Sequence, residues 1–276
     1  MTPRQFNAAL WRHYRTKGRH DMPWRKTRDP YRILVSEIML QQTQVSRVGP
    51  FYRNFIKKFP DFRALAAAKT VDVLKAWQGL GYNRRAIALQ NLSRIVLEKF
   101  NDRLPDDRDD LESLPGIGPG TSGSLMAFAF NKPVVFIETN IRRVFIHHFF
   151  KNRADVTDAE IERCIERTMS RRRAREWYWA LMDYGSWLAT GDARLANPNR
   201  RSAHYAKQKK FKGSDRELRG RILKLLVGAR GASSAKAIAR TLNEAPIRVR
   251  GAADALVREG FLAKMEQNES AYCIKE

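Results

Sequence analysis

The sequence predicts a mainly α-helical body followed by a small C-terminal α+β domain of the winged-helix kind. Apolar residues recur with the helical period in successive segments between residues 6 and 190. No alternating apolar and polar strand pattern occurs before residue 210. A polar, basic stretch without periodicity, residues 197–213, then separates this body from residues 214–276, and we interpret it as a linker.

The expected helices follow from apolar residues that recur every three or four positions. Phe6, Leu10 and Tyr14 mark the first helix. Residues 31–45 are apolar on most sides, which predicts a buried helix. Amphipathic helices are expected over residues 48–59, 71–80, 84–100, 141–150, 158–169 and 175–189. Residues 109–130 indicate two helical pieces joined by a Gly/Pro hairpin.

Residues 214–276 have a different layout. Helices are expected over residues 215–226, 233–243 and 247–260, and two strands around an Asn-containing turn over residues 261–276. Three helices followed by a β-hairpin indicate a winged helix-turn-helix domain. Arg248 and Arg250 open the third helix, which makes that helix the candidate DNA reader. The alternative is a small helical module for dimerisation or packing.

The charge of the chain indicates its class of partner. Lys and Arg total 52 against 29 Asp and Glu, a formal net charge of +23, and such a field attracts nucleic acid. No apolar stretch is long enough to predict a membrane span, and the N-terminus lacks the apolar core of a signal peptide. The two cysteines, Cys164 and Cys273, suit neither a disulfide framework nor a metal-ligand cluster. We therefore expect a monomeric cytoplasmic protein, associated with the nucleoid in a bacterium.

The most informative backbone signal is the hairpin of residues 114–120, LPGIGPG. Gly116 and Gly118 permit positive φ and let backbone N–H groups approach an oxygen atom closely. The following helix, expected to start near Gly120 and Thr121, adds the positive end of its dipole. Together they predict a sequence-independent phosphate clamp. The alternative is an ordinary tight corner between two helices.

These residues carry a resemblance to the helix-hairpin-helix DNA glycosylases. Four motifs occur in that family's order and spacing: Ser36–Val45, Gly79–Tyr82, Leu114–Thr121 and Glu138–Val144. Met22–Arg25 and Ala180–Gly185 match the same pattern. Over residues 1–190 the chain most resembles the MutY-type adenine DNA glycosylases. The resemblance implies a two-lobed glycosylase fold in residues 1–196, with one six-helix lobe at 28–133 and a second lobe formed by 1–27 and 134–196.

The resemblance also implies a catalytic pair. Glu37 takes the place of the acid that protonates the leaving base, and its apolar helix favours the protonated form. Glu138 stands where the family has Asp, as the carboxylate that stabilises the sugar cation. Asn140 is expected to cap the next helix and orient that carboxylate. The alternatives are a buried ion-pair partner for Glu37 and a purely helix-capping carboxylate for Glu138.

Other residues gain roles from the same resemblance. Gln42 and Tyr82 match the residues that enter the DNA stack when a base is flipped out. Trp24 and Leu40 are expected to line the base pocket, with core packing as the alternative for Trp24 and for Tyr82. Trp179 lies about where relatives place Gln or Glu near the base, which indicates a changed substrate.

The resemblance further limits the chemistry. Gly120 occupies the position of the Lys nucleophile in strand-cutting relatives, so we expect a monofunctional enzyme. The positions that hold iron–sulfur cysteines in many relatives are here Ala189, Ala196, Asn199 and Tyr205. We therefore expect no iron–sulfur cluster and no other cofactor, apart from a monovalent cation at the hairpin.

The sequence thus predicts a monofunctional DNA glycosylase that acts on a flipped mispaired, damaged or modified base in double-stranded DNA, with adenine as the first candidate. One alternative is removal of thymine or uracil from mismatches. Another is a catalytically inactive protein that binds DNA. The winged-helix-like region takes the place of the Nudix-like domain of MutY enzymes, so the opposing base stays open.

Overall fold

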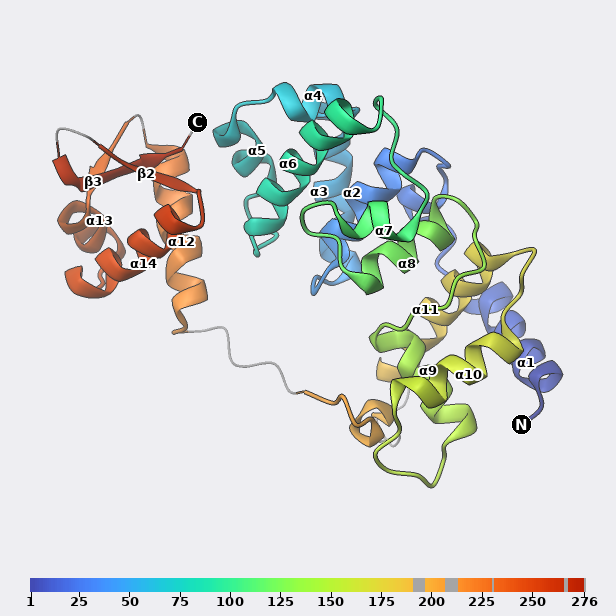
Figure 1. Cartoon of the computed structure of the whole chain (residues 1–276). Helices are drawn as coiled ribbons and strands as arrows, with labels where there is room; N and C mark the ends of the chain where they lie inside the picture. Colours follow the sequence, from blue (N-terminus) through green and yellow to red (C-terminus); the bar gives the residue numbers. More distant parts are fainter. Residues whose placement is uncertain (191–196, 207–212, 230, 266–267, 276) are drawn as a thin grey trace. The chain divides into compact units, whose positions relative to one another are not determined.

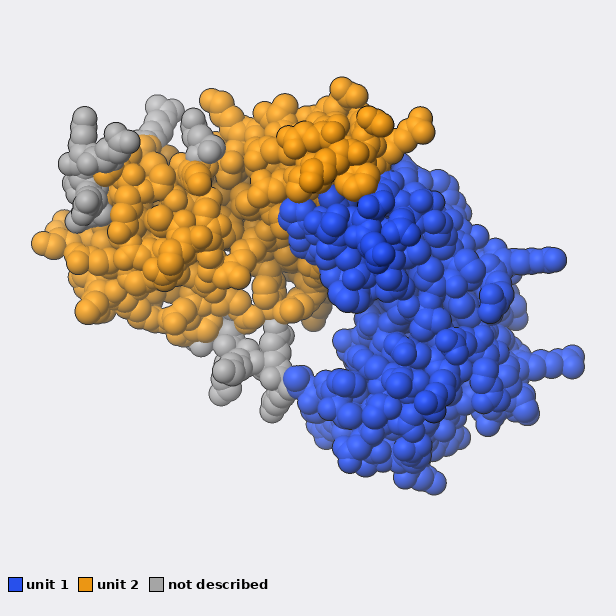
Figure 2. All heavy atoms as spheres, in the orientation of Figure 1, with its two compact units in different colours: residues 1–38, 104–207 blue, residues 39–103, 208–276 orange. Residues whose placement is uncertain are grey.

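The computed structural model describes residues 1–190, 197–206, 213–229, 231–265 and 268–275, and it confirms a mainly helical chain with a small C-terminal α+β region (Figure 1). The chain forms two compact units, which Figure 2 distinguishes by colour. Unit 1 comprises Met1–Ile38 and Leu104–Lys207, and unit 2 comprises Met39–Arg103 and Gln208–Glu276.

Unit 1 is built around the packing of α9 on α11, with α1 on the same helix α11 (Figure 1). Its helices are α1 Pro3–Lys17, α2 Pro30–Leu40, α7 Arg108–Glu112, α8 Pro119–Phe128, α9 Thr139–Phe149, α10 Asp158–Thr168 and α11 Ala174–Thr190, with 3-10 turns η1 Pro23–Arg25 and η2 Pro198–Arg201. The last two residues of α2 fall in unit 2. Helix α1 begins with a capping box between Thr2 and Gln5. It buries Phe6, Leu10 and Tyr14, as their spacing predicts.

Unit 2 contains one group of helices before residue 104 and another after residue 213. Its helices are α3 Val45–Lys58, α4 Phe62–Ala67, α5 Thr70–Trp77, α6 Arg84–Lys99, α12 Asp215–Gly228, α13 Ala235–Leu242 and α14 Pro246–Arg258. Its strands are β1 Ser233–Ser234, β2 Leu262–Met265 and β3 Asn268–Ile274, in the antiparallel order β1-β3-β2. The predicted three helices and hairpin are present. Strand β1 was not predicted because two residues are too short to show alternation.

Several boundaries differ from the predictions. The helix expected over 31–45 ends at Leu40, and α3 starts at Val45, because the polar residues 41–44 separate the apolar helix α2 from the amphipathic helix α3. Helix α4 was not predicted from the sequence. The lobe boundaries expected at residues 28 and 133 differ from the unit boundaries at 38/39 and 103/104. One reason is that α8 packs against α11, which keeps the hairpin helices in unit 1.

The first ten residues of the expected linker, 197–206, are instead part of unit 1. Pro198, Asn199 and Ser202 are buried, and this segment packs on α9. The Val156 amide donates to the Arg201 carbonyl (2.9 Å). The polar, basic composition of the segment did not predict this packing, because backbone and side-chain amide groups make its hydrogen bonds. Residues 207–212 of the expected linker lie outside the described residues.

The buried His148 of α9 makes the stability of unit 1 depend on pH. Its ring contacts Phe6 and Tyr184, and Nε2 has no hydrogen-bond partner within the described ranges. Burial, and then the neighbouring His147 and Lys151, lower the pKa of His148 to about 4. The unfolded chain, with an ordinary pKa near 6.5, then binds the proton first, so stability falls as pH drops from about 6.5 to about 4.

We expect His148→Phe to remove this pH-dependent loss. Between pH 7.5 and pH 4.5 the wild-type protein should lose on the order of 2–3 kcal/mol more unfolding free energy than the variant. Urea unfolding at both pH values measures the difference. Equal losses in the two proteins would contradict the assignment to His148.

Candidate active site

Glu37 lies on helix α2, where its neighbours Ser36 and Ile38 are buried. The residue keeps some exposure, but its carboxyl is closely surrounded by protein atoms. Burial raises the pKa of Glu37 to about 7; the nearby Glu138 carboxylate also raises it, whereas a hydrogen bond from Ser124 and the charge of Arg25 lower it. This carboxyl therefore exists in both protonation states near neutral pH.

Glu138 is the N-cap of helix α9. Its Oε1 accepts hydrogen bonds from the amides of Asn140 (2.6 Å) and Ile141 (2.9 Å), and Oε2 accepts one from Asn140 Nδ2 (3.3 Å). Burial raises the pKa of Glu138, while these amide bonds and the charges of Arg143 and Arg142 lower it. The expectation that Asn140 caps the helix is wrong, because the Glu138 carboxylate itself accepts from the first-turn amides.

The two carboxyls interact within unit 1, since the charge of Glu138 contributes to the raised pKa of Glu37. Glu138 is thus a capping residue and also a neighbour of a second carboxyl. Glu138 is therefore not an isolated surface charge. The geometry provides one carboxyl that can hold a proton beside another that is held by three hydrogen-bond donors.

A buried ion pair holds the short turn η1 beside this site. Nη1 and Nη2 of Arg25 donate to the Asp183 carboxylate (2.7 and 2.9 Å), and Arg19 donates to it through Nε (2.6 Å) and its backbone amide (2.9 Å). Burial alone would raise the pKa of Asp183, but Arg25 and Arg19 lower it below its ordinary value. Both residues lie in motifs that match the family, Met22–Arg25 and Ala180–Gly185, but the sequence did not predict a role for either of them. Their opposite charges in two matching motifs were a sequence signal for this ion pair.

The candidate pocket aromatics Trp24 and Trp179 are 6% and 7% exposed. Trp179 stacks on Phe128 (6.2 Å between ring centroids), and Arg25 lies over the Trp179 ring at 5.3 Å. Both tryptophans belong to unit 1, as do Glu37 and Glu138, whereas the half-buried Leu40 belongs to unit 2. Trp24 and Trp179 are therefore largely packed side chains.

The hairpin between α7 and α8 forms as predicted, with one difference. Gly116 has φ +82°, but Gly118 has φ −111° and is the N-cap of α8. Gly120 and Thr121 lie in the first turn of α8, which starts at Pro119. A Cβ on Gly120 would meet nothing closer than the Ile137 carbonyl, at 3.9 Å. Gly120 therefore leaves open space beside the backbone of Ile137, the residue before Glu138.

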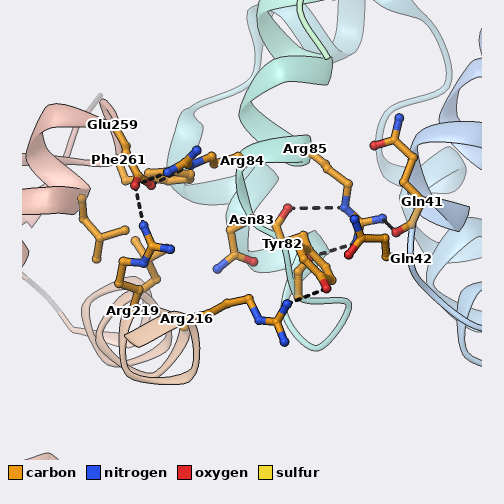
Figure 3. Close-up of a pocket in the computed structure, with 14 residues that line it drawn as sticks. Gln41, Gln42, Tyr82, Asn83, Arg84, Arg85, Arg216, Arg219, Glu259 and Phe261 are labelled. Carbon is orange, nitrogen blue, oxygen red and sulfur yellow. Dashed lines mark hydrogen bonds and ion pairs between the residues drawn. The ribbon is translucent and has the colours of Figure 1, made fainter. Parts of the chain in front are cut away.

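Gln42 and Tyr82 lie in unit 2, on turns in which both have positive φ, +54° and +50° (Figure 3). Such backbone is costly for residues with side chains and is often found at functional sites. Arg85 connects the two turns, because its Nη1 donates to the Gln41 carbonyl (2.6 Å) and its Nη2 to the Gly81 carbonyl (3.0 Å). Sequence reasoning did not identify Arg85.

A cavity of about 390 Å³ in unit 2 is lined by Gln42, Tyr82 and residues of α12 (Figure 3). Arg216 donates to the Tyr82 hydroxyl (2.7 Å) and lies over its ring at 5.0 Å. Glu259 accepts from Arg84 and from Arg219. The cavity lining is therefore rich in arginine.

The two arginines predicted to read DNA lie in the first turns of α14. Arg248 is engaged within the C-terminal region, since it donates to Glu244 (2.9 Å) and to the Gly213 carbonyl (2.8 Å). Arg250 is exposed, and so is Ile247 (83%). The exposed start of α14 thus presents Ile247 and Arg250 to solvent.

No group of three or more His, Cys, Asp or Glu side chains that could hold a metal ion occurs among the described residues. None of their helices has the length and apolar character that crossing a membrane requires. Four positions of this chain correspond to the iron–sulfur cysteines of many relatives. Of these, Asn199 is buried, Ala189 and Tyr205 are exposed, and Ala196 lies outside the described residues.

Comparison with known proteins agrees with this geometry. Residues 35–175 match the family described as "HhH-GPD superfamily base excision DNA repair protein". The adenine DNA glycosylase of Mycobacterium tuberculosis is 32% identical over 251 residues, which cover 82% of this chain and 80% of that enzyme. The chain belongs to the HhH-GPD superfamily.

The chain is also similar to glycosylases that act on pyrimidines according to their names. The thymine/uracil-DNA glycosylase of Pyrobaculum aerophilum is 32% identical over 192 residues, which cover 67% of this chain and 84% of that enzyme. The structure of a thermostable thymine-DNA glycosylase has a TM-score of 0.61 and 25% identity, covering 73% of this chain and 93% of that chain. The chain spans about half the length, 54% and 43%, of two Buchnera aphidicola adenine DNA glycosylases that it matches.

Proposed function

We propose that this HhH-GPD protein is a monofunctional DNA glycosylase that hydrolyses the N-glycosidic bond of a mispaired, damaged or modified base in double-stranded DNA, with adenine as the first candidate. The observation that carries the proposal is the interacting pair Glu37 and Glu138, two carboxyls with raised pKa in one unit. Similarity to adenine DNA glycosylases supports the same reaction.

In this proposal Glu37 is the general acid. A general acid is most effective when its pKa lies near the working pH, and the pKa of Glu37 is about 7. Two neighbouring carboxyls disfavour double ionisation, so the pair retains a proton. The donors around Glu138 favour the charged form there, which leaves the proton to Glu37. Glu37 can then protonate the leaving base.

Glu138 is the proposed stabilising carboxylate. The sugar becomes cationic as the base departs, and a fixed negative charge lowers the energy of that state. The same carboxylate can orient the attacking water. With Gly120 no amine is available at the position of the Lys nucleophile, so no Schiff base forms there and the strand stays intact.

DNA binding is assigned to several parts of the chain. The hairpin amides around Gly116 and Gly118, with the start of α8 at Gly120 and Thr121, suit a phosphate group. The positive-φ residues Gln42 and Tyr82 are the proposed wedge that supports base flipping. The exposed Arg250, and Arg248 after release from its ion pairs, would contact DNA from α14. Trp24 and Trp179 are the proposed walls of the base pocket in unit 1.

The remaining expectations are also proposals. We propose that the protein acts as a monomer on cytoplasmic, nucleoid DNA. With only two cysteines in the sequence it cannot supply the four thiolates of an iron–sulfur cluster. The hairpin carbonyls are the proposed site for a monovalent cation.

A panel of duplexes under single-turnover conditions tests the function. Adenine opposite 8-oxoguanine, guanine or cytosine and the pairs G·T and G·U are incubated with excess enzyme, with and without alkali. We expect alkali-dependent cleavage at the adenine strand. Cleavage of G·T and G·U alone would select the pyrimidine function that the Pyrobaculum aerophilum relative carries. No cleavage of any duplex would refute the enzyme, and breaks without alkali would refute the monofunctional mechanism.

A further inference from the structure

Arg143 connects the candidate active site to the segment 197–206. It is 7% exposed, and its Nη1 donates to Asn140 Oδ1 (2.8 Å) and to the Gly185 carbonyl (2.7 Å). Its Nε donates to Asn197 Oδ1 (3.2 Å). One guanidinium therefore joins helix α9, helix α11 and the turn η2 within unit 1.

The orientation of the Asn140 amide follows from this bond. A guanidinium can only donate hydrogen bonds, so the amide atom that faces Arg143 must be the oxygen, Oδ1. The NH₂ end of Asn140 then faces Glu138 and donates to Oε2 (3.3 Å). The Asn140 backbone is closely packed as well, since a Cβ on Gly185 would lie 2.4 Å from the backbone carbonyl oxygen of Asn140.

Asn197 is itself held in place by its segment. Its Oδ1 also accepts from the Asn199 amide (3.1 Å), and Asn199 Nδ2 donates to the Thr139 carbonyl (3.0 Å). Further along the segment, Arg201 donates to the Phe150 carbonyl at the end of α9 (2.6 Å). The segment is thus fastened at both ends of the helix that Glu138 caps.

From these contacts we infer that Asn197 and Arg143 are positioning residues for Glu138. The inference rests on the proposed function, in which Glu138 stabilises the sugar cation. The three bonds form one chain: Asn197 fixes the guanidinium, the guanidinium fixes the Asn140 amide, and the amide fixes Oε2 of Glu138. Segment 197–206 thereby becomes part of the active-site support.

The physical reason is the length of the glutamate. Glu138 has one more rotatable bond than an aspartate, so its carboxylate has more positions to choose from. Among the residues that the structure describes, the backbone amides of Asn140 and Ile141 hold Oε1, and the Asn140 side chain holds Oε2. If Arg143 loses Asn197, its guanidinium can turn and release the Asn140 amide. A displaced carboxylate then stabilises the cation less well.

Substitutions at Asn197 test the inference through a conservative pair. Asn197→Asp keeps an oxygen for Arg143 and for the Asn199 amide, and its single-turnover rate should stay within about two-fold of the wild type. Asn197→Leu keeps the size but removes the acceptor, and its rate should fall by about ten- to a hundred-fold with unchanged DNA affinity. Arg143→Lys has a single nitrogen, which cannot take the places of both Nε and Nη1, so its rate should fall like that of Asn197→Leu.

Arg201→Gln is the matched control, because it loosens the same segment without touching the chain of bonds to Glu138. All variants are assayed at a temperature where circular dichroism shows them folded. Equal rates for Asn197→Leu and Asn197→Asp, or an equal loss in Arg201→Gln, would overturn the inference.

Amide hydrogen exchange provides a readout that is independent of catalysis. The Asn140 and Ile141 amides that donate to Glu138 should exchange faster in Asn197→Leu than in Asn197→Asp. Unchanged exchange would overturn the positioning role even if the enzyme is active. A wild-type protein that cuts no duplex would refute only the proposed function, and the exchange result would still decide the inference.

Discussion

Glu37→Gln is expected to lower the rate of base release by about 10³-fold or more, while DNA affinity stays near that of the wild type. Glutamine has the same size but cannot deliver a proton to the leaving base. The loss should be visible in the single-turnover rate with a duplex that the wild-type protein cleaves. Glu166→Gln, which removes an exposed carboxylate on α10, is the matched control for the change of charge and should keep the rate.

The pH dependence of the wild-type rate follows from the same residue. The raised pKa means that Glu37 is protonated below about pH 7 and loses its proton above it. The single-turnover rate should therefore fall as pH rises through about 7. A rate that is flat from pH 6 to pH 9, or a Glu37→Gln variant with wild-type activity, would exclude Glu37 as the acid.

Asp183→Ala is expected to produce the largest loss of stability, about 3–5 kcal/mol of unfolding free energy. The Asp183 side chain is 1% exposed and that of Arg25 is 5% exposed. Removing the carboxylate leaves a buried guanidinium without its counter-charge. The turn η1, which carries Trp24, would lose its attachment to α11.

Asp158→Ala is the control for this prediction. Asp158 also accepts two hydrogen bonds from one arginine, Arg142, but its side chain is 31% exposed. Solvent screens that pair, so its removal should cost about 1 kcal/mol or less. Urea unfolding of both variants at pH 7 gives the comparison. Equal losses would show that burial does not control the contribution of these pairs.

Local signals in the sequence were sufficient for most of the fold. Helical periodicity identified the long helices, and four motifs in register identified the superfamily, which comparison confirmed. The elements that the sequence did not predict are either very short or polar. Helix α4 and strand β1 span six and two residues, too few for a periodic pattern. The segment 197–206 is polar and basic, and its hydrogen bonds leave no trace in composition.

The sequence by itself determined which residues are candidates: Glu37 in an apolar helix, Glu138 before α9, and a Gly/Pro hairpin between α7 and α8. Only the tertiary structure decided their chemical state. The pKa of Glu37 depends first on burial and then on Ser124, Glu138 and Arg25, which come from three other parts of the chain. The capping role of Glu138 and its link through Arg143 to Asn197 also depend on contacts across unit 1. Burial and electrostatic interaction are properties of distance in space, and distance in space is set by folding.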